Sequence, residues 1–459
     1  MRRLSLVLSV STLVVLGLLA LAPVAGAAMP PDGSWSWSQP YVPAAGPHAF
    51  RAITGGTGFS FYTLGDDWSS EWVVNRVDTA ADGEGSTDWT DTRIGPAGST
   101  GAEASFLGTD RAKNLYVVGT DTTHGGDIYL VKYAPGPDLK VLWEKSWDGP
   151  KHFADAPHGI AVTASGNVFV AGTMGKAAGY DDAVLLKYDS AGRLKWKYVV
   201  STARYDSFEA IALDSRGNAY VTGQRNGDVG VATMVTVKVD PYGHRVWQRA
   251  IAGLGVSYTG DFIKVKGSAV YVAGILYKWA DWPVVAKYSL AGKFAWAWTP
   301  SSPIDRVAGM TVDAKGRVVL VGTFDTTLGP DALTTAWVDM LAADGRSLTA
   351  SGMYFADYGA TSYPVIFHDV ALDGSGNIYL AGEWWTNSGG TEGNALVARI
   401  GSPDLPGATF QMEKIWRLDG PASGVDQFWG LLRQSDGFYA VGTEHTGLGW
   451  QAIAHRLDP

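Results

Sequence analysis

Short apolar stretches separated by turn-forming residues recur along almost the whole chain. In the clearest copy, apolar residues at 210–213, 219–222 and 234–239 are separated by turn residues, and a fourth stretch carries Trp247. The turn between the first two stretches, at 214–218, contains Asp, Gly and Asn. Alternating apolar and polar residues between such turns are typical of β-strands. Each copy is therefore predicted to form a four-stranded antiparallel sheet.

One six-residue phrase marks the second strand of each copy and ends in glycine. It reads Asn-Leu-Tyr-Val-Val-Gly at 114–119 and Asn-Ala-Tyr-Val-Thr-Gly at 218–223. With degenerate copies included, the closing residues are Gly65, Gly119, Gly172, Gly223, Gly274, Gly322, Gly382 and Gly442. A period of roughly 50 to 60 residues is the spacing of propeller blades. The sequence therefore predicts an all-β fold, a β-propeller of eight four-stranded blades, or of seven if the divergent copy around 50–92 is something else.

The two ends of the predicted ring complete each other. The last copy, at 427–457, ends after its third strand, whereas residues 33–40 resemble the fourth-strand phrase at 141–147. We expect this N-terminal strand to complete the last blade, because closing the ring removes exposed sheet edges. Residues 28–459 would then form a single propeller domain.

Tryptophan recurs with the repeat, shortly after the third strand of most copies. Because these residues follow the blade period, we expect them to pack between neighbouring blades. The copy around Ser347 and Leu348 lacks this Trp, which puts its outer strand in doubt. The recurring residues are Trp89, Trp143, Trp196, Trp247, Trp296 and Trp416.

The stretch from Asp182 to Gly223 carries the most regular version of two linked motifs. They are Lys-Tyr-Asp-x-x-Gly-x-x-x-Trp and Asp-x-x-Gly-Asn-x-Tyr-Val-x-Gly. In these motifs the chain resembles the SBBP-type beta-propeller repeat proteins of bacterial secreted and surface proteins. The resemblance implies the fold, but it implies no catalytic residue and no cofactor.

The first residues have the order of a secretory signal. Arg2 and Arg3 precede an apolar stretch at 4–22, and small residues follow at Ala25 and Ala27. We expect a signal peptide at 1–27 and a secreted, extracellular or cell-surface protein, with an uncleaved membrane anchor as the alternative. The chain has no cysteine, which excludes disulfides and Cys-bound metal. Its formal net charge of −9 argues against nucleic acid and anionic membranes as partners, and we expect a monomer.

Several aromatic residues fall outside the blade period, in stretches expected to be variable loops. The ligand-binding candidates are Trp279, Trp282, Trp384, Trp385 and Tyr358. Aromatic rings on loops stack on sugars or contact peptide side chains at low entropic cost. The same rings could instead fill gaps beneath long loops.

Polar residues just before the first strand of several copies would surround the mouth of a central channel. They include His158, Glu209, Asp261 and His368, which could supply acid and base groups. A second acidic set, Glu71, Asp127, Asp182, Asp281 and Asp331, precedes the third strands. We expect that set to be structural, with calcium as a minor alternative, and we predict no metal site and no cofactor.

Three functional classes remain open. The favoured one is a non-catalytic binding or scaffold protein that recognises a glycan or protein ligand through aromatic loops. The alternative is a carbohydrate-active enzyme, a polysaccharide lyase or glycosidase, with His158, Glu209 and His368 as catalytic candidates. The repeat also resembles the Trp-docked ring of the pyrroloquinoline-quinone dehydrogenases. This class ranks last, because many of those enzymes carry an adjacent cysteine pair and this chain has no cysteine.

Overall fold

The computed structural model describes most of the repeated region. The described residues are 35–41, 49–56, 60–66, 72–78, 90–94, 103–121, 125–136, 138–177, 180–226, 231–253, 256–277, 281–300, 306–325, 334–348, 353–354, 365–385, 392–401, 411–418, 424–434, 437–446 and 449–457. The predicted signal peptide at 1–27 lies outside them.

The described strands form seven four-stranded sheets and one five-stranded sheet, all with antiparallel pairing. The first four in chain order are β2–β5 (Ala49–Gly55, Ser60–Asp66, Trp72–Asp78, Thr90–Ile94), β6–β9 (Glu103–Thr109, Leu115–Asp121, Asp127–Tyr133, Val141–Trp147), β10–β13 (Ala156–Val162, Val168–Ala177, Tyr180–Tyr188, Leu194–Val200) and β14–β17 (Asp206–Leu213, Ala219–Asn226, Ala232–Val239, Arg245–Ile251).

The remaining sheets follow the same order of pairing, except that β18 and β19 both pair with β20. They are β18–β22 (Ser257–Tyr258, Phe262–Lys266, Ala269–Tyr277, Asp281–Ser289, Phe294–Trp298), β23–β26 (Arg306–Val312, Val318–Asp325, Thr334–Leu341, Met353–Tyr354), β27–β30 (Val365–Leu372, Ile378–Trp385, Gly393–Gly401, Gln411–Leu418) and β31–β33 with β1 (Gln427–Gln434, Gly437–Thr446, Gly449–Leu457, Trp35–Tyr41).

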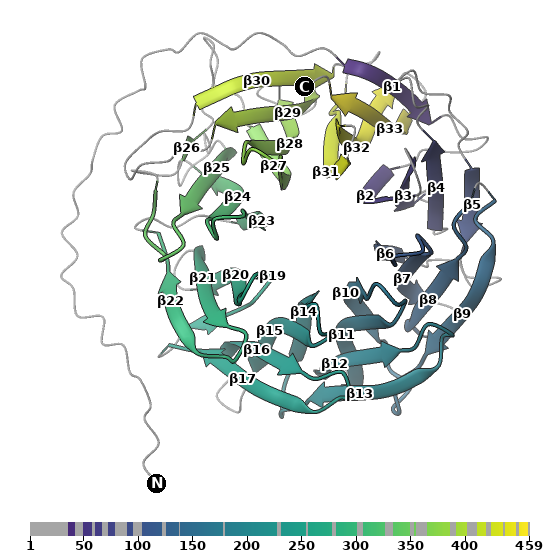
Figure 1. The fold of residues 1–459 in the computed structure, drawn as a ribbon, viewed down its shortest axis with the longest axis vertical. Coiled ribbons are helices and arrows are strands. Elements are labelled where there is room, and N and C mark those ends of the chain that lie inside the picture. Colours follow the sequence, from purple (N-terminus) through teal and green to yellow (C-terminus); the bar gives the residue numbers. More distant parts are fainter. Residues whose placement is uncertain are drawn as a thin grey trace.

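The sheets are arranged around a common centre, as Figure 1 shows. An early strand of each sheet, such as β10, β14 or β19, lies nearest the centre, and the last, such as β13 or β17, lies at the periphery. The fold is a β-propeller. Strand β1 pairs with β33, with Trp37 opposite Arg456, so strands from both ends of the chain share one sheet.

The two ends of each sheet differ in their connections. The first strand connects to the second, and the third to the fourth, at one end of each sheet, which we call the turn end. Connections from the second to the third strand, and from one sheet to the next, lie at the other end, which we call the loop end. Between neighbouring sheets the core is continuous: Phe169 and Leu185 of one sheet pack with Val221 and Val237 of the next.

The closing glycine of the repeated phrase is required by a close backbone approach. In sheet β14–β17 the pairing of the first two strands shifts between Phe208 and Ala210, which marks a β-bulge. The shift brings the carbonyl oxygen of Ser207 against Gly223, where a Cβ would overlap it. The same approach occurs at Gly172, Gly274, Gly322, Gly382 and Gly442. The glycine in the sequence phrase therefore accommodates a bulge in the neighbouring strand.

The recurring tryptophans that the structure describes pack between sheets, as predicted, whereas Trp89 lies outside the described residues. Trp196 on β13 donates its indole N–H to the carbonyl oxygen of Pro241, in the third turn of the next sheet, at 3.0 Å. Its ring lies against Gly243, where a Cβ would be 2.9 Å away and where φ is +95°. Equivalent indole bonds run from Trp143 to Ser190, from Trp247 to Leu290 and from Trp296 to Ala343.

A lysine on the third strand reinforces each of these contacts. Lys187 donates to the same Pro241 carbonyl at 2.7 Å, and its ammonium group lies 5.2 Å from the ring centroid of Phe169. Lys132, Lys238 and Lys287 make the equivalent bonds to the next sheet. In these four consecutive sheets, the same pair of hydrogen bonds thus holds the turn end to the next sheet.

The sheet that lacks the recurring Trp, near Ser347 and Leu348, does have an outer strand, but this strand is short. Within the residues that the structure describes, the outer strand of that sheet, β26, spans two residues, Met353–Tyr354. Ser347 makes a single bridge to Leu341, and the backbone N–H of Leu348 donates to Met340. Without the docking Trp, this sheet keeps three full strands and a short fourth.

Candidate functional site

The first strand of most sheets contains a bulge near the loop end, and one residue is left without a partner there. A bulge re-aims the side chain of the extra residue. The prediction placed these polar residues just before the first strands, but His158, Glu209 and His368 lie inside them, at the bulges of β10, β14 and β27. Asp261 directly precedes β19 and donates its backbone N–H to Ala273. In the first strands of three other sheets, the residues at the bulge are Ser105, Ala308 and Trp429.

His158 and Glu209 form a close pair between neighbouring sheets. His158 Nδ1 lies 2.5 Å from Glu209 Oε2, and the side chains are 23% and 25% exposed. Burial alone would raise the pKa of Glu209, but the hydrogen bond and the charge of His158 outweigh it, so the pKa is lowered. Glu209 is therefore an ionised hydrogen-bond partner of the imidazole.

Asp261 adds a third titratable group beside this pair. Burial raises its pKa to about 6, the hydroxyl of Thr259 donates to it at 3.3 Å, and the charge of Glu209 raises the pKa further. The positive charge of Arg306 on β23 acts in the opposite direction. Side chains from consecutive sheets thus form one electrostatic group, which we call the mouth cluster: His158, Glu209 and Asp261.

His368 belongs to a different arrangement. Its ring stacks on Trp429 of the next sheet, with the centroids 4.1 Å apart and the planes at 28°. Its Nε2 lies 3.8 Å from the carboxylate of Glu383, which also accepts a hydrogen bond from Gln427. His368 thus lies against Glu383 and Trp429, whereas His158 and Glu209 lie against each other. The importance of Trp429 at a bulge could have been found by aligning it with His158 and His368.

The chemistry available to the mouth cluster is proton exchange and charge recognition. A carboxyl group that titrates near neutral pH beside an ionised carboxylate and a histidine is a combination seen at acid and base catalysts. The same combination also suits binding of a cationic or hydroxyl-rich ligand. Nothing in the cluster supplies a nucleophile held by a separate base and orienting group.

The three aromatic candidates that the structure describes occupy strand ends rather than loops. Trp384 and Trp385 are the last residues of β28, and Trp282 is the second residue of β21, opposite Leu276. These three lie at the loop end of their sheets and are half-buried. The guanidinium of Arg417 lies 5.1 Å from the Trp384 ring, and Trp384 also packs on the core. Trp279 and Tyr358 lie outside the described residues.

The second acidic set has structural partners where it is described. Asp182 pairs with Lys176 at 2.5 Å, whereas Glu71 and Asp331 lie outside the described residues. Asp214 accepts hydrogen bonds from the backbone and side-chain nitrogens of Asn218 at 3.0 and 2.7 Å, as a hairpin turn requires.

One acidic group has the geometry to hold a cation. Carboxylate oxygens of Asp127, Asp148 and Asp155 lie within 4.8 Å of one another. Asp155 is fully buried and accepts the backbone N–H groups of Gly149 and Gly175 at 2.6 and 3.0 Å. Burial raises its pKa to about 6 despite these bonds, and the charges of the other two carboxylates raise it further. Through its two hydrogen bonds, Asp155 joins the segment at Gly149 to strand β11 at Gly175.

Comparisons with known proteins give fold-level similarity. No protein-family model matches the sequence, and the search of curated proteins finds no match. Membership of the SBBP-type family is therefore not shown. Among the described residues, no helix is long and apolar enough to cross a membrane.

Three solved structures illustrate the structural similarity. Drosophila Semaphorin 1a, extracellular domains 1-2, is 10% identical, with a TM-score of 0.47 over 77% of this chain and 86% of that one. A neuraminidase-like protein of A/little yellow-shouldered bat/Guatemala is 6% identical, with a TM-score of 0.41 over 78% and 96%. A eukaryotic initiation factor is 11% identical, with a TM-score of 0.41 over 86% and 82%.

Proposed function

We propose that this protein is a secreted, non-catalytic binding or scaffold protein that recognises a glycan or protein ligand at the loop end of its propeller. The observation that carries the proposal is the partial exposure of Trp282, Trp384 and Trp385 at that end. Large, partly exposed rings beside polar groups are the usual means of contacting sugars and peptides. The cation of Arg417 over Trp384 adds a polar group to this surface.

The surrounding scaffold supports a rigid recognition surface. We propose an eight-bladed ring that β1 closes through β33, acting as a monomer, of the SBBP type, exported through the signal at 1–27. The repeated contacts at the turn end hold the sheets, which leaves the loop end free to vary. Binding residues concentrate on variable segments that a rigid scaffold positions.

The test is a glycan and polysaccharide binding screen on the protein from Ala28 onward, compared with the Trp385→Ala and Trp384→Phe variants. We expect retention on the bound glycan to fall at least tenfold with unchanged thermal unfolding. Tyr242→Ala is the matched control, because Tyr242 is 79% exposed at the turn end. Equal binding by all variants, or a fall matched by the control, would refute the aromatic surface.

A carbohydrate-active enzyme is the second candidate, favoured by the mouth cluster. The ionised Glu209 and the raised pKa of Asp261 place two carboxyl groups with different proton affinities near each other. Product analysis of every polysaccharide that binds separates the two candidates. Released oligosaccharides that disappear in Glu209→Gln would establish the enzyme, whereas binding without products supports recognition alone.

A further inference from the structure

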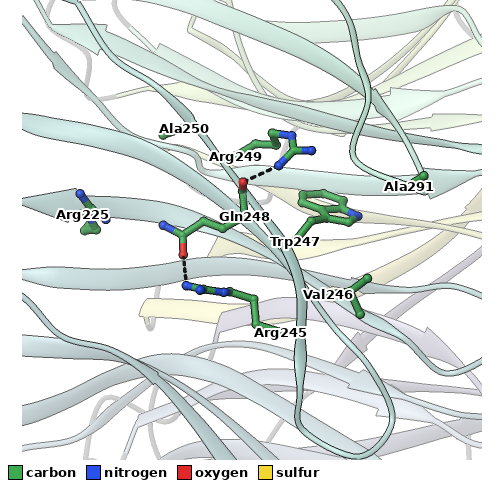
Figure 2. Close-up of a pocket in the computed structure, with 8 residues that line it drawn as sticks. All are labelled: Arg225, Arg245, Val246, Trp247, Gln248, Arg249, Ala250 and Ala291. Atoms are coloured by element: carbon green, nitrogen blue, oxygen red, sulfur yellow. Dashed lines mark hydrogen bonds between the residues drawn. The ribbon is translucent and has the colours of Figure 1, made fainter. Parts of the chain in front are cut away.

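A hollow lined by three arginines lies along the peripheral strand of sheet β14–β17. Figure 2 shows the residues that line the hollow. The volume of the hollow is about 650 Å³. Arg245 and Arg249 come from β17 and Arg225 from the end of β15. The other lining residues are Val246, Trp247, Gln248, Ala250 and Ala291.

Two of the arginines are held in place by hydrogen bonds that leave their charge uncompensated. Arg249 donates to the carbonyl oxygens of Gly292 and Gln248 at 2.6 and 2.8 Å, and its guanidinium lies 5.7 Å from the Trp247 ring. Arg245 donates to the side-chain oxygen of Gln248 at 3.1 Å, as Figure 2 shows. Gln248 thus links the two cations and orders them around the hollow.

The local charge is opposite in sign to that of the whole chain. Strands β13 and β17 together contain Lys195, Lys197, Arg245 and Arg249 and no acidic residue, whereas the chain carries a formal charge of −9. Among the described residues, none of the three arginines of the hollow has a carboxylate partner. Lysine alone would protect an exposed edge strand. Protection of the edge strand therefore does not explain why three arginines and a glutamine line one hollow.

We propose that this hollow binds the oxyanion groups, carboxylate or sulfate, of an acidic oligosaccharide. Guanidinium groups match such oxyanions with paired hydrogen bonds, and the volume is that of a small-ligand site. A nucleic acid fits less well, because Trp247 is 6% exposed and offers no open ring for base stacking, and the acidic chain repels a long polyanion. The proposal is independent of the loop-end function.

The experiment is calorimetric titration of the whole secreted chain with three probes at low salt. The probes are a galacturonic acid trisaccharide, a sulfated maltotriose and neutral maltotriose. We expect one or both charged probes to bind and neutral maltotriose not to bind, with affinity falling as salt rises. The charged probe that binds more tightly identifies carboxylate or sulfate as the preferred group.

Variants locate the site. The exposed Arg225→Gln and Arg245→Gln changes should each weaken the charged probe about tenfold, the loss of one charge-assisted hydrogen bond. Arg216→Gln removes the same charge from an exposed turn of the same sheet and should leave affinity unchanged. Trp385→Ala should also leave it unchanged, which separates this site from the loop end. Absence of binding by both charged probes, or equal weakening by Arg216→Gln, would overturn the proposal.

Discussion

The turn end and the loop end of the sheets share one repeated backbone but use it differently. At the turn end, Trp196 and Trp247 make the same bond to the next sheet, to Pro241 and Leu290 at 3.0 Å. At the loop end, equivalent bulges carry His158, Glu209 and Ala308. The repeat therefore keeps the same contact between sheets at the turn end. At the loop end, the residue at the bulge differs from sheet to sheet.

The largest expected effect comes from breaking a turn-end contact. Replacing Trp247 with Ala removes a ring that is 6% exposed and its bond to Leu290. The free energy of unfolding should fall by about 3 to 5 kcal/mol, measured by urea denaturation. Val246→Ala, at an exposed position on the same strand, should change it little. A loss below about 1 kcal/mol for Trp247→Ala would contradict an energetic role for the docking Trp.

This prediction refines what the sequence indicated for Trp196. A fully buried Trp196 would lose about 3 to 5 kcal/mol on truncation to Ala. In the structure Trp196 is half-buried, so its truncation should cost less than that of Trp247. Ranking the two variants in one denaturation series tests whether the contact energy follows ring burial.

A smaller effect is expected from removing the space that the bulge needs. Gly223→Ala places a Cβ against the carbonyl of Ser207, so the two strands must separate locally. The free energy of unfolding should fall by about 1 to 3 kcal/mol. Gly55→Ala is a matched control, because a Cβ there meets no atom within 4 Å. If both substitutions are equally mild, the bulge geometry does not explain the closing glycine.

Features that recur were predictable from the sequence, because recurrence identifies a shared structural role. The four-strand pattern, the closing glycine and the packing of Trp196 could all be predicted in this way. The bulges could not, because a bulge is a shift in strand pairing and leaves no residue signature beyond the glycine opposite it. This is why His158 and Glu209 were placed before their strands instead of within them.

The spatial grouping of candidate residues was the harder part to predict. His158 and Glu209 are 51 residues apart and meet because they occupy equivalent positions in neighbouring sheets. His368 meets the bulge residue of the next sheet in the same way, but that residue is Trp429. Similarly, Trp384 and Trp385 looked like loop residues because Gly and Asn follow them, whereas strand pairing extends to Trp385 opposite Gly393. Side-chain neighbours across sheets depend on ring geometry, which composition does not encode.

The smallest expected effect tests whether a buried charge at the loop end lowers the stability of the folded protein. Burial raises the pKa of Asp261 from 3.8 to about 6. Below pH 3.8 the group is protonated in both states and has no effect. As pH rises, the unfolded chain ionises first, so the folded state loses stability until about pH 6 and stays lower above it. Asp261→Asn should therefore be more stable than the native chain at pH 7.5, by about 1 to 2 kcal/mol.

The pH dependence of this difference decides its cause. The advantage of Asp261→Asn in urea denaturation should shrink as pH falls from 6 and vanish below 3.8, because the native carboxyl group is then neutral as well. Adding Glu209→Gln removes a negative charge that raises the pKa of Asp261, so the advantage should become smaller at pH 7.5. An advantage that stays constant from pH 3.5 to 7.5 would mean that Asn only packs better, and the mouth cluster would then lack the electrostatic coupling that distinguishes it from the turn end.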